Sequence, residues 1–212
     1  TVDDSVDLST NVASITLAAN SVIDVAAGGA DQAITLADVT GDFDLTLTGD
    51  SASAVGLNAV DVDALAVTGT LTLNDNITVD DSVDLSTNVA SITLAANTVI
   101  DVAAGGADQA ISLADTTGNF DLTLTGDSAS ALGVDGADVN GLTLTGGVLT
   151  LNGDVESDGA LDFTNVGSIT LGGNVIVTSQ NSDSGNAAGN ITFDSANIIT
   201  GVPSAGPACC VR

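Results

Sequence analysis

Residues 1–17 read TVDDSVDLSTNVASITL, and residues 78–94 repeat the same letters. The match extends over residues 1–56 and 78–133, where 51 of 56 aligned positions are identical. The differences are Ser21/Thr98, Thr35/Ser112, Val39/Thr116, Asp42/Asn119 and Val55/Leu132. A third, diverged copy is visible in NVGSITLGGN (165–174), which matches NVASITLAAN (88–97) at the same interval. Tandem self-similarity at one constant interval is typical of stacked repeat architectures.

Within each copy an apolar–Thr–apolar triplet recurs, and this alternation predicts strands with one buried face. The triplets begin at Ile15, Ile34, Leu45, Leu71, Ile77, Ile92, Leu122, Leu142, Leu149, Ile169 and Ile191. Clusters such as Gly28-Gly29-Ala30-Asp31, Thr40-Gly41-Asp42 and Gly49-Asp50-Ser51 separate them and predict turns. No segment has a helical period with caps, so we expect an all-β protein with almost no helix.

The triplet spacing together with the tandem repeat favours a parallel β-helix, that is, a β-solenoid. With roughly 19–20 residues per turn, one 77-residue repeat would make about four turns, and each turn would meet a copy of its own surface. A pair of small immunoglobulin-like sandwiches is the alternative, although the Cys–Trp–Cys core of that fold is missing. The expected divisions are repeat 1 (1–77), repeat 2 (78–154), a partial diverged repeat 3 (155–201) and a non-repeat tail (202–212).

The composition limits the partners that this protein can have. The chain has a formal net charge of −27, contains no Lys or His, and has Arg212 as its only basic residue. Nucleic acids and anionic lipids are bound through cationic side chains, so neither is an expected partner. With 44% hydrophobic residues the chain can nevertheless bury apolar surface, which argues against disorder. No run is apolar and long enough to span a membrane as a helix.

The segments GLTLTGGVLTLNGDV (141–155) and GSITLGGNVIVTSQNSDSGNAAGNITFDSANIITG (167–201) resemble the repeat regions of large secreted bacterial exoproteins of the filamentous-haemagglutinin and autotransporter type. The resemblance lies in the residue types and their alternation, not in an invariant motif, and it covers most of the chain. It implies a right-handed parallel β-helix, secretion to the bacterial cell surface, and a role in adhesion, biofilm or surface layers.

The residue types needed for most catalytic chemistry are missing. A nucleophilic triad needs a base such as His or Lys, and polysaccharide lyases need a basic residue. Two Asp pairs, Asp42/Asp44 and Asp61/Asp63, have the residue type of a glycosidase pair, but their repeat equivalents are Asn119/Asp121 and Asp138/Asn140. We therefore expect no enzyme, and predict no catalytic or cofactor-binding residue.

Calcium is the one cofactor for which the sequence offers ligands, because Asp residues in turns supply carboxylate and carbonyl oxygens. The candidates are Asp3-Asp4…Asp7, its copy Asp80-Asp81…Asp84, Asp42/Asp44 and Asp61/Asp63, and Gly105-Gly106-Ala107-Asp108 has a trace of the Ca²⁺-binding nonapeptide pattern. The competing interpretation is that Asp serves turns and solubility, while the total charge binds cations diffusely.

Three further features remain open. The pairs Thr46/Thr48, Thr123/Thr125 and Thr143/Thr145 could form an outward ice-binding array, although the triplets are not spaced by one constant length. Phe43, Phe120, Phe163 and Phe193 stand in apolar strand contexts that favour core packing. The tail VPSAGPACCVR (202–212) holds adjacent Cys209 and Cys210, which cannot easily pair with each other and could crosslink chains.

Together these observations predict a non-enzymatic extracellular rod that is structural or adhesive. Thr1 corresponds to Thr78, inside a repeat, so we expect turns to continue in a longer chain or molecules to associate end to end into filaments. Cell-surface or matrix components are the expected partners. The alternatives are an ice-binding module, a Ca²⁺-dependent carbohydrate-binding module and, less favoured, a polysaccharide-active enzyme.

Overall fold

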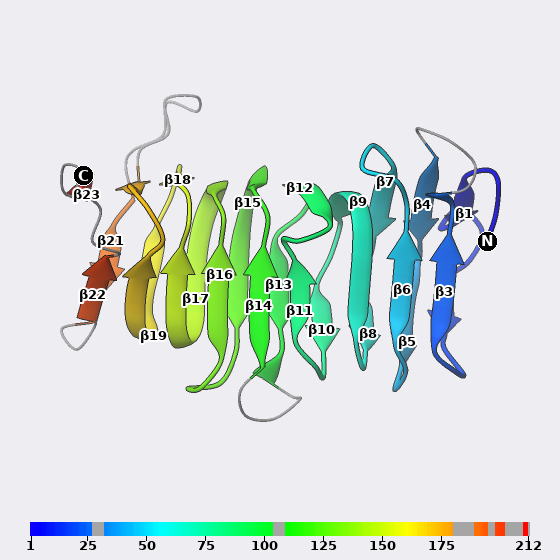
Figure 1. Ribbon diagram of the computed structural model, residues 1–212, viewed down its shortest axis with the longest axis horizontal. Coiled ribbons are helices and arrows are strands. Elements are labelled where there is room, and N and C mark those ends of the chain that lie inside the picture. The colour runs from blue at the N-terminus through cyan, green and yellow to red at the C-terminus, as the bar shows by residue number, and fades with distance from the viewer. Residues whose placement is uncertain (27–31, 104–108, 180–188, 195–197, 202–209, 212) are drawn as a thin grey trace.

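A computed structural model describes residues 1–26, 32–103, 109–179, 189–194, 198–201 and 210–211. All strand pairings in these parts of the chain are parallel, and no α-helix occurs in them. The strands stack along one long axis, with β1 near one end and β22 near the other (Figure 1). The predicted β-solenoid is confirmed, and sandwiches of antiparallel sheets were the wrong alternative.

Each turn of the solenoid passes three faces. Face 1 comprises β1 (Val6–Leu8), β4 (Ala33–Leu36), β7 (Ala54–Leu57), the end of β9 (Leu65–Leu73), β12 (Val89–Leu94), the start of β15 (Thr116–Thr125), the start of β17 (Ala137–Leu151), β18 (Val155–Ser157), β20 (Ile176–Thr178) and β23 (Cys210–Val211). Face 2 comprises β2 (Ser14–Thr16), β5 (Asp38–Gly41), β8 (Val60–Val62), β10 (Ile77–Val79), β13 (Thr98–Asp101), the end of β15, the middle of β17, the start of β19 (Leu161–Leu171) and β21 (Ile191–Phe193). Face 3 comprises β3 (Ser21–Asp24), β6 (Leu45–Thr48), the start of β9, β11 (Val83–Leu85), β14 (Ala110–Leu113), β16 (Ala131–Val134), the ends of β17 and β19, and β22 (Ile198–Gly201).

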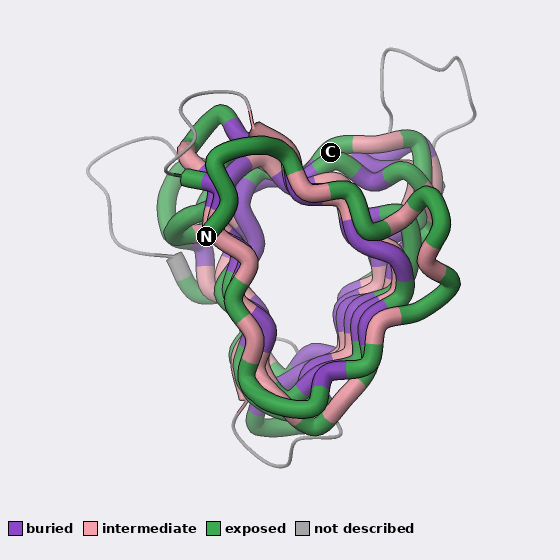
Figure 2. The backbone as a smooth tube through the Cα atoms, turned by 90° about the vertical axis from the view of Figure 1, so that its right-hand side faces the viewer, coloured by how far each residue is buried: buried purple, intermediate pink, exposed green. Residues whose placement is uncertain are grey.

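Aliphatic side chains fill the space between the three faces. On face 1, Ile34, Val55, Leu71 and Ile92 follow one another in register through successive turns, and each is at most 1% exposed. Viewed along the rod, buried residues line the inside of a three-sided tube and exposed residues its outside (Figure 2). Because one aliphatic residue stacks on the next, the core is continuous along the rod and needs few aromatic side chains.

The Thr of each triplet points outward, as the alternation predicted. In β9 buried residues, all aliphatic except Gly69, alternate strictly with half-buried or exposed ones. Thr72 lies beside Gly56 in one neighbouring turn and Thr93 in the other. Outward β-branched residues suit strands because they pack against their neighbours on the pleated surface.

The turns differ in length. One turn runs from Val55 to its register partner Leu71, whereas a much longer one runs from Val6 to its partner Ile34. The roughly 19–20 residues expected per turn are therefore only an average, in keeping with the uneven spacing of the triplets. The strand segments keep their register while the corners and loops absorb the difference, which is thermodynamically inexpensive for surface connections.

The sequence copies do not stack on one another. Ile15, Ile92 and Ile169 are equivalent residues of the three copies, and they lie on faces 2, 1 and 3 respectively. From Val6 on face 1 to Val83 on face 3 the chain advances by eleven face segments, which is three and two-thirds turns. The expectation that each turn meets a copy of its own surface is thus wrong, because one sequence copy does not make a whole number of turns. The division of the chain at residues 77, 154 and 201 stays a prediction.

Three of the four Phe residues pack as predicted. Phe163 is fully buried and stacks on Phe193, with ring centroids 5.1 Å apart and an interplanar angle of 12°. Phe43 packs, partly buried, against the same core. Phe120 contradicts the expectation: it is 36% exposed, because β15 shifts register against β17 between Gly118 and Asp121.

Gly41 and Gly118 are equivalent residues at which only glycine fits. Their φ angles are +146° and +149°. A Cβ would lie 2.7 Å from the Leu17 carbonyl oxygen in the first copy and 2.6 Å from that of Leu94 in the second. Gly118 stands directly before a register shift and Gly41 ends β5, and both let one turn approach the backbone of the neighbouring turn.

We predict that Gly118→Ala lowers the free energy of unfolding by about 1–3 kcal/mol, because the backbone conformation is almost exclusive to glycine. Gly133→Ala is the matched control, since its Cβ would meet Ser112 Oγ at 3.4 Å, an ordinary contact. Chemical denaturation of both variants checks this. Equal stability of the two variants would show that the constraint at Gly118 is absent.

Candidate functional surface

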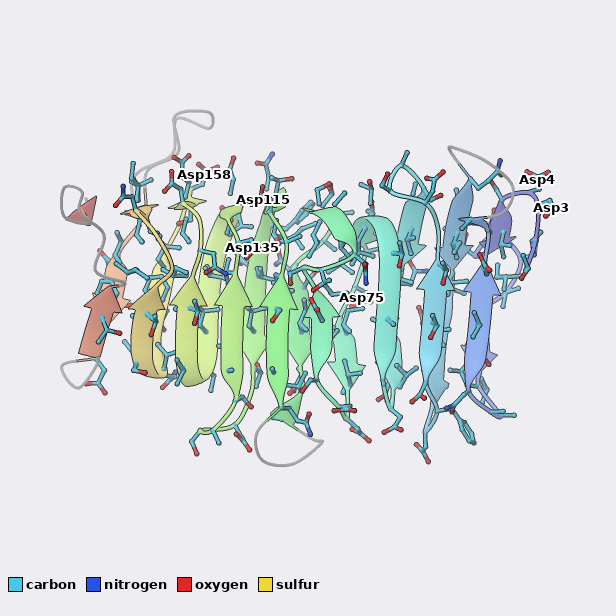
Figure 3. The ribbon with its side chains drawn as sticks, viewed as in Figure 1. Asp3, Asp4, Asp75, Asp115, Asp135 and Asp158 are labelled. Carbon is cyan, nitrogen blue, oxygen red and sulfur yellow. The ribbon has the colours of Figure 1, made fainter. Side chains whose placement is uncertain are left out.

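The two clusters Asp3-Asp4…Asp7 and Asp80-Asp81…Asp84 form corner turns. Asp4 accepts a hydrogen bond from the Ser5 amide at 2.8 Å, and Asp81 accepts one from the Ser82 amide at 2.7 Å. Asp3 and Asp4 lie at the N-terminal end of the rod (Figure 3). Each cluster thus uses carboxylates to bind its own backbone, which is what Asp in turns commonly does.

Asp84 shows this role most clearly. Its carboxylate accepts hydrogen bonds from the hydroxyls of Ser86 at 2.7 Å and Thr87 at 2.6 Å, and from the amides of both residues. Partial burial alone would raise the pKa of Asp84, but these donors outweigh it and lower the pKa to about 2. The Thr10 hydroxyl and the Ser9 amide and hydroxyl lower the pKa of Asp7 to about 2 in the same way.

The paired aspartates are not paired with each other. Asp44 bonds to Asn20 in the preceding turn, accepting from Nδ2 at 2.6 Å and donating its amide to Oδ1 at 3.2 Å. Asp61 is exposed on face 2, between Thr40 and Thr78. The structure places these side chains in inter-turn contacts and outward rows, not around a shared cleft.

In the second copy the equivalent of Asp44 is Asp121, which repeats the amide contact but has a different partner for its carboxylate. Its amide donates to Asn97 Oδ1 at 3.0 Å, and its carboxylate accepts from Asn140 Nδ2. Asp138 lies elsewhere, on β17 beside Glu156 of β18.

A shallow hollow on face 1 gathers more acidic residues than any predicted cluster. Its volume is about 350 Å³, and its acidic lining residues are Asp115, Asp135, Asp138, Asp154 and Glu156. The other lining residues are Thr, Gly and Ala. Figure 3 shows Asp115 and Asp135 near each other in the half of the rod away from the N-terminus. This hollow concentrates negative charge, because half of its lining residues are acidic and none is cationic.

Backbone geometry brings these residues together. Asp115, Asp135 and Asp154 occupy the same corner in successive turns, each just before a face 1 segment. Asp135 accepts from Asn152 Nδ2 at 2.9 Å, and Asp154 accepts from the Ile176 amide at 2.8 Å. Hydrogen bonds from neighbouring turns thus stabilise two of the carboxylates.

Sequence reasoning singled out Asp138 but missed Asp115, Asp135, Asp154 and Glu156. The available signal was an Asp one or two residues before three successive face 1 segments, which start at Thr116, Ala137 and Val155. That signal becomes visible only once the strands are assigned to faces, because the turns between these corners differ in length.

The Asp clusters predicted to bind calcium do not form a metal-binding cluster in the described parts of the chain. Among the described residues no group of three or more His, Cys, Asp or Glu side chains could hold a metal ion. The Gly105-Gly106-Ala107-Asp108 segment lies outside the described residues. The hollow can therefore attract cations through its potential, but its carboxylates do not converge as the ligands of a bound Ca²⁺ do.

Asp158 is the one buried carboxylate in the described parts of the chain. It follows β18, is 8% exposed, and its Oδ1 has no hydrogen-bond partner among the residues that the structure describes. Its amide donates to the Val139 carbonyl at 3.1 Å, which ties this corner to the preceding turn. A carboxylate in such a place is costly to bury without donors.

The predicted Thr pairs do point outward. Thr123 and Thr125 on β15 lie directly beside Thr143 and Thr145 on β17, so two pairs form a small array on face 2. Beyond it the rows change character, since Thr125 neighbours Asp101 and Thr143 neighbours Asp162. The varying turn length leaves the threonines in register, but the Asp residues among them prevent a continuous Thr array.

The tail contributes little. Cys209 lies outside the described residues, and Cys210 forms β23 with Val211, pairing in parallel with β20. No helix in the described parts of the chain is long and apolar enough to cross a membrane.

We predict that Thr87→Val raises the pKa of Asp84 from about 2 toward 3.8, because it removes the hydroxyl donor. The depressed pKa stabilises the fold above pH 3.8, and this contribution disappears as the pH falls toward 2. The variant should therefore melt below the wild type at neutral pH, and the difference should shrink across that window.

Carbon-13 NMR titration of the Asp84 carboxyl and thermal melts at several pH values check this prediction. Thr72→Val, on the outer side of β9, is the control, and its melting difference should not change between pH 3.8 and about 2. An unchanged Asp84 titration in Thr87→Val would contradict the assignment.

Comparison with known proteins identified no relative of this chain. No protein-family model matches the chain, and no curated protein or solved structure matches it. The function is therefore argued from the fold and its surface.

Proposed function

We propose that this chain is a non-enzymatic structural rod of a bacterial cell surface or extracellular matrix. The observation that carries the proposal is the continuous stack of turns, whose mainly aliphatic interior runs from Val6 on β1 to Phe193 on β21. A solenoid of this kind resists bending and holds its ends a fixed distance apart. Its length and continuity are the properties that a spacer or fibre needs.

The surface supports a spacer more than a catalyst. Its acidic hollow is shallow and lined by Asp, Glu, Thr, Gly and Ala. Glycan-active clefts use aromatic stacking, and a general acid must be placed opposite a second carboxylate. The resemblance to filamentous-haemagglutinin and autotransporter repeats supports the finer proposal that the rod belongs to a secreted adhesin.

The high negative charge keeps separate rods apart. With a net charge of −27, association end to end requires that salt or divalent cations screen the repulsion. We therefore propose cations as diffuse counter-ions of the rod. A dedicated Ca²⁺ site, which would also serve a carbohydrate-binding module, is the competing proposal.

We expect small-angle scattering and cryo-electron microscopy to show slender rods with a strand repeat of about 4.8 Å along the axis. Rods should stay single at low salt and lengthen at high salt. NaCl and CaCl₂ at equal ionic strength should lengthen them equally. Lengthening by CaCl₂ alone would favour a specific Ca²⁺ site, and a length that never responds to either salt would contradict screened association.

A pair of variants separates association at the ends from association at the sides. Leu8→Lys adds a cation at the N-terminal edge, and Val148→Lys adds the same charge on the flank; the two residues are 36% and 43% exposed. Only Leu8→Lys should block lengthening at high salt. Thermal hysteresis would instead support the ice-binding alternative, and release of reducing sugars from a glycan panel would overturn the non-enzymatic proposal.

A further inference from the structure

The N-terminal edge of the rod is formed by β1, β2 and β3. Each of these strands has a described partner on one side only, namely β4, β5 and β6. Aliphatic side chains are exposed there: Val2 is 42% exposed and Leu8 is 36% exposed. Such an edge presents unpaired backbone groups and apolar surface together.

The same sequence occurs a second time in the molecule, and there it is covered. Val79 and Leu85 are the equivalents of Val2 and Leu8, and both are 0% exposed. The identical letters NVASITL give only a three-residue strand in the first copy, β2, but the six-residue strand β12 in the second. The second copy therefore shows what this sequence looks like when its edge is occupied.

The covering segment is residues 62–77, which supply one turn. In this turn Leu71 pairs with Ile92, and Ile77 pairs with Ile100. Gly69, with a φ angle of +133°, lies opposite Val89, where β12 shifts register before Ser91. The covering turn therefore matches β12 in two ways: its glycine lies at the irregularity of the strand, and its aliphatic side chains contact the aliphatic side chains of β12.

Polar contacts reinforce the fit. The amides of Asp81, Ala95 and Val99 donate to the Asp63 carbonyl at 2.9 Å, the Leu73 carbonyl at 2.8 Å and Asn76 Oδ1 at 2.7 Å. The equivalent donors of the first copy are the amides of Asp4, Ala18 and Val22. These three amides lie on the outer side of the N-terminal edge, where the structure describes no further turn. Val22 is 65% exposed there.

We propose that the edge formed by β1, β2 and β3 is a docking surface for one additional solenoid turn with the sequence of residues 62–77. The proposal rests on the rod function and specifies how the rod is extended. In the docked turn, the counterparts of Leu71 and Ile77 stack on Ile15 and Ile23.

A second molecule of this chain cannot supply this turn from its own residues 62–77. In that molecule residues 62–77 already have strand partners on both sides. Its β9 pairs with β6 and β7 in the preceding turn and with β12 in the following turn. The occupant is thus a repeat turn that is free on one side, as it is when repeats follow one another along one chain.

The test adds residues 62–77 (VDALAVTGTLTLNDNI) directly before Thr1 of the full chain, which reproduces the native junction between Ile77 and Thr78. We expect the amides of β1–β3 to exchange with solvent more slowly, by on the order of tenfold or more. The control carries Leu71→Asp and Ile77→Asp in the added segment only, and should leave the exchange of β1–β3 unchanged.

Two results would overturn the proposal. One is equal protection by the native and the control extension, which would make the effect nonspecific. The other is protection of β1–β3 in the unextended chain that rises with protein concentration at low salt, where rods should stay single; a second molecule would then be the occupant. Scattering of the same samples reports rod shape separately, so a failure of docking is distinguishable from a failure of the rod function.

Discussion

The parallel register between successive turns is the constraint on which the whole structure depends. It places one aliphatic residue above another on each face, as with Val55, Leu71 and Ile92, and thereby makes the core continuous. The same register sends the intervening residue outward. Because side chains alternate with a period of two, a slip of one residue would turn every buried side chain to solvent. The core therefore enforces the pairing as strongly as the hydrogen bonds do.

The charge of the chain is compatible with this fold because the corners provide donors for its carboxylates. Asp84 is held by Ser86 and Thr87 of its own turn, while Asp44 and Asp135 are held by Asn20 and Asn152 of the preceding and following turns. These hydrogen bonds take the place that ion pairs with Lys or Arg would occupy in an ordinary protein. Negative charge that remains on the outer faces keeps the rod solvated and discourages lateral aggregation.

The local structure was predictable because the strand signal is local. Triplets such as Ile34-Thr35-Leu36 become strands with the expected inward and outward residues. Turn length was not predictable, because the corners accommodate a short turn, from Val55 to Leu71, and a long one, from Val6 to Ile34, equally well. Without turn lengths the neighbours across turns stay unknown. That is why the acidic hollow around Asp115 and Asp135 escaped sequence reasoning. Phe120 was assigned to the core because the register shift between Gly118 and Asp121 has no signal in the alternating pattern.

The mismatch between repeat and turn gives the rod a screw-like surface. Each sequence copy ends two-thirds of a turn beyond a whole number, so the next begins on another face, as Ile15, Ile92 and Ile169 show. In a longer array of such copies, any feature of the sequence would wind around the axis and return to its starting face only at the fourth copy. A flat partner lying along one side would meet a different part of the repeat at each step. Duplication of this unit therefore multiplies a binding feature in all directions around the rod instead of lining it up on one side.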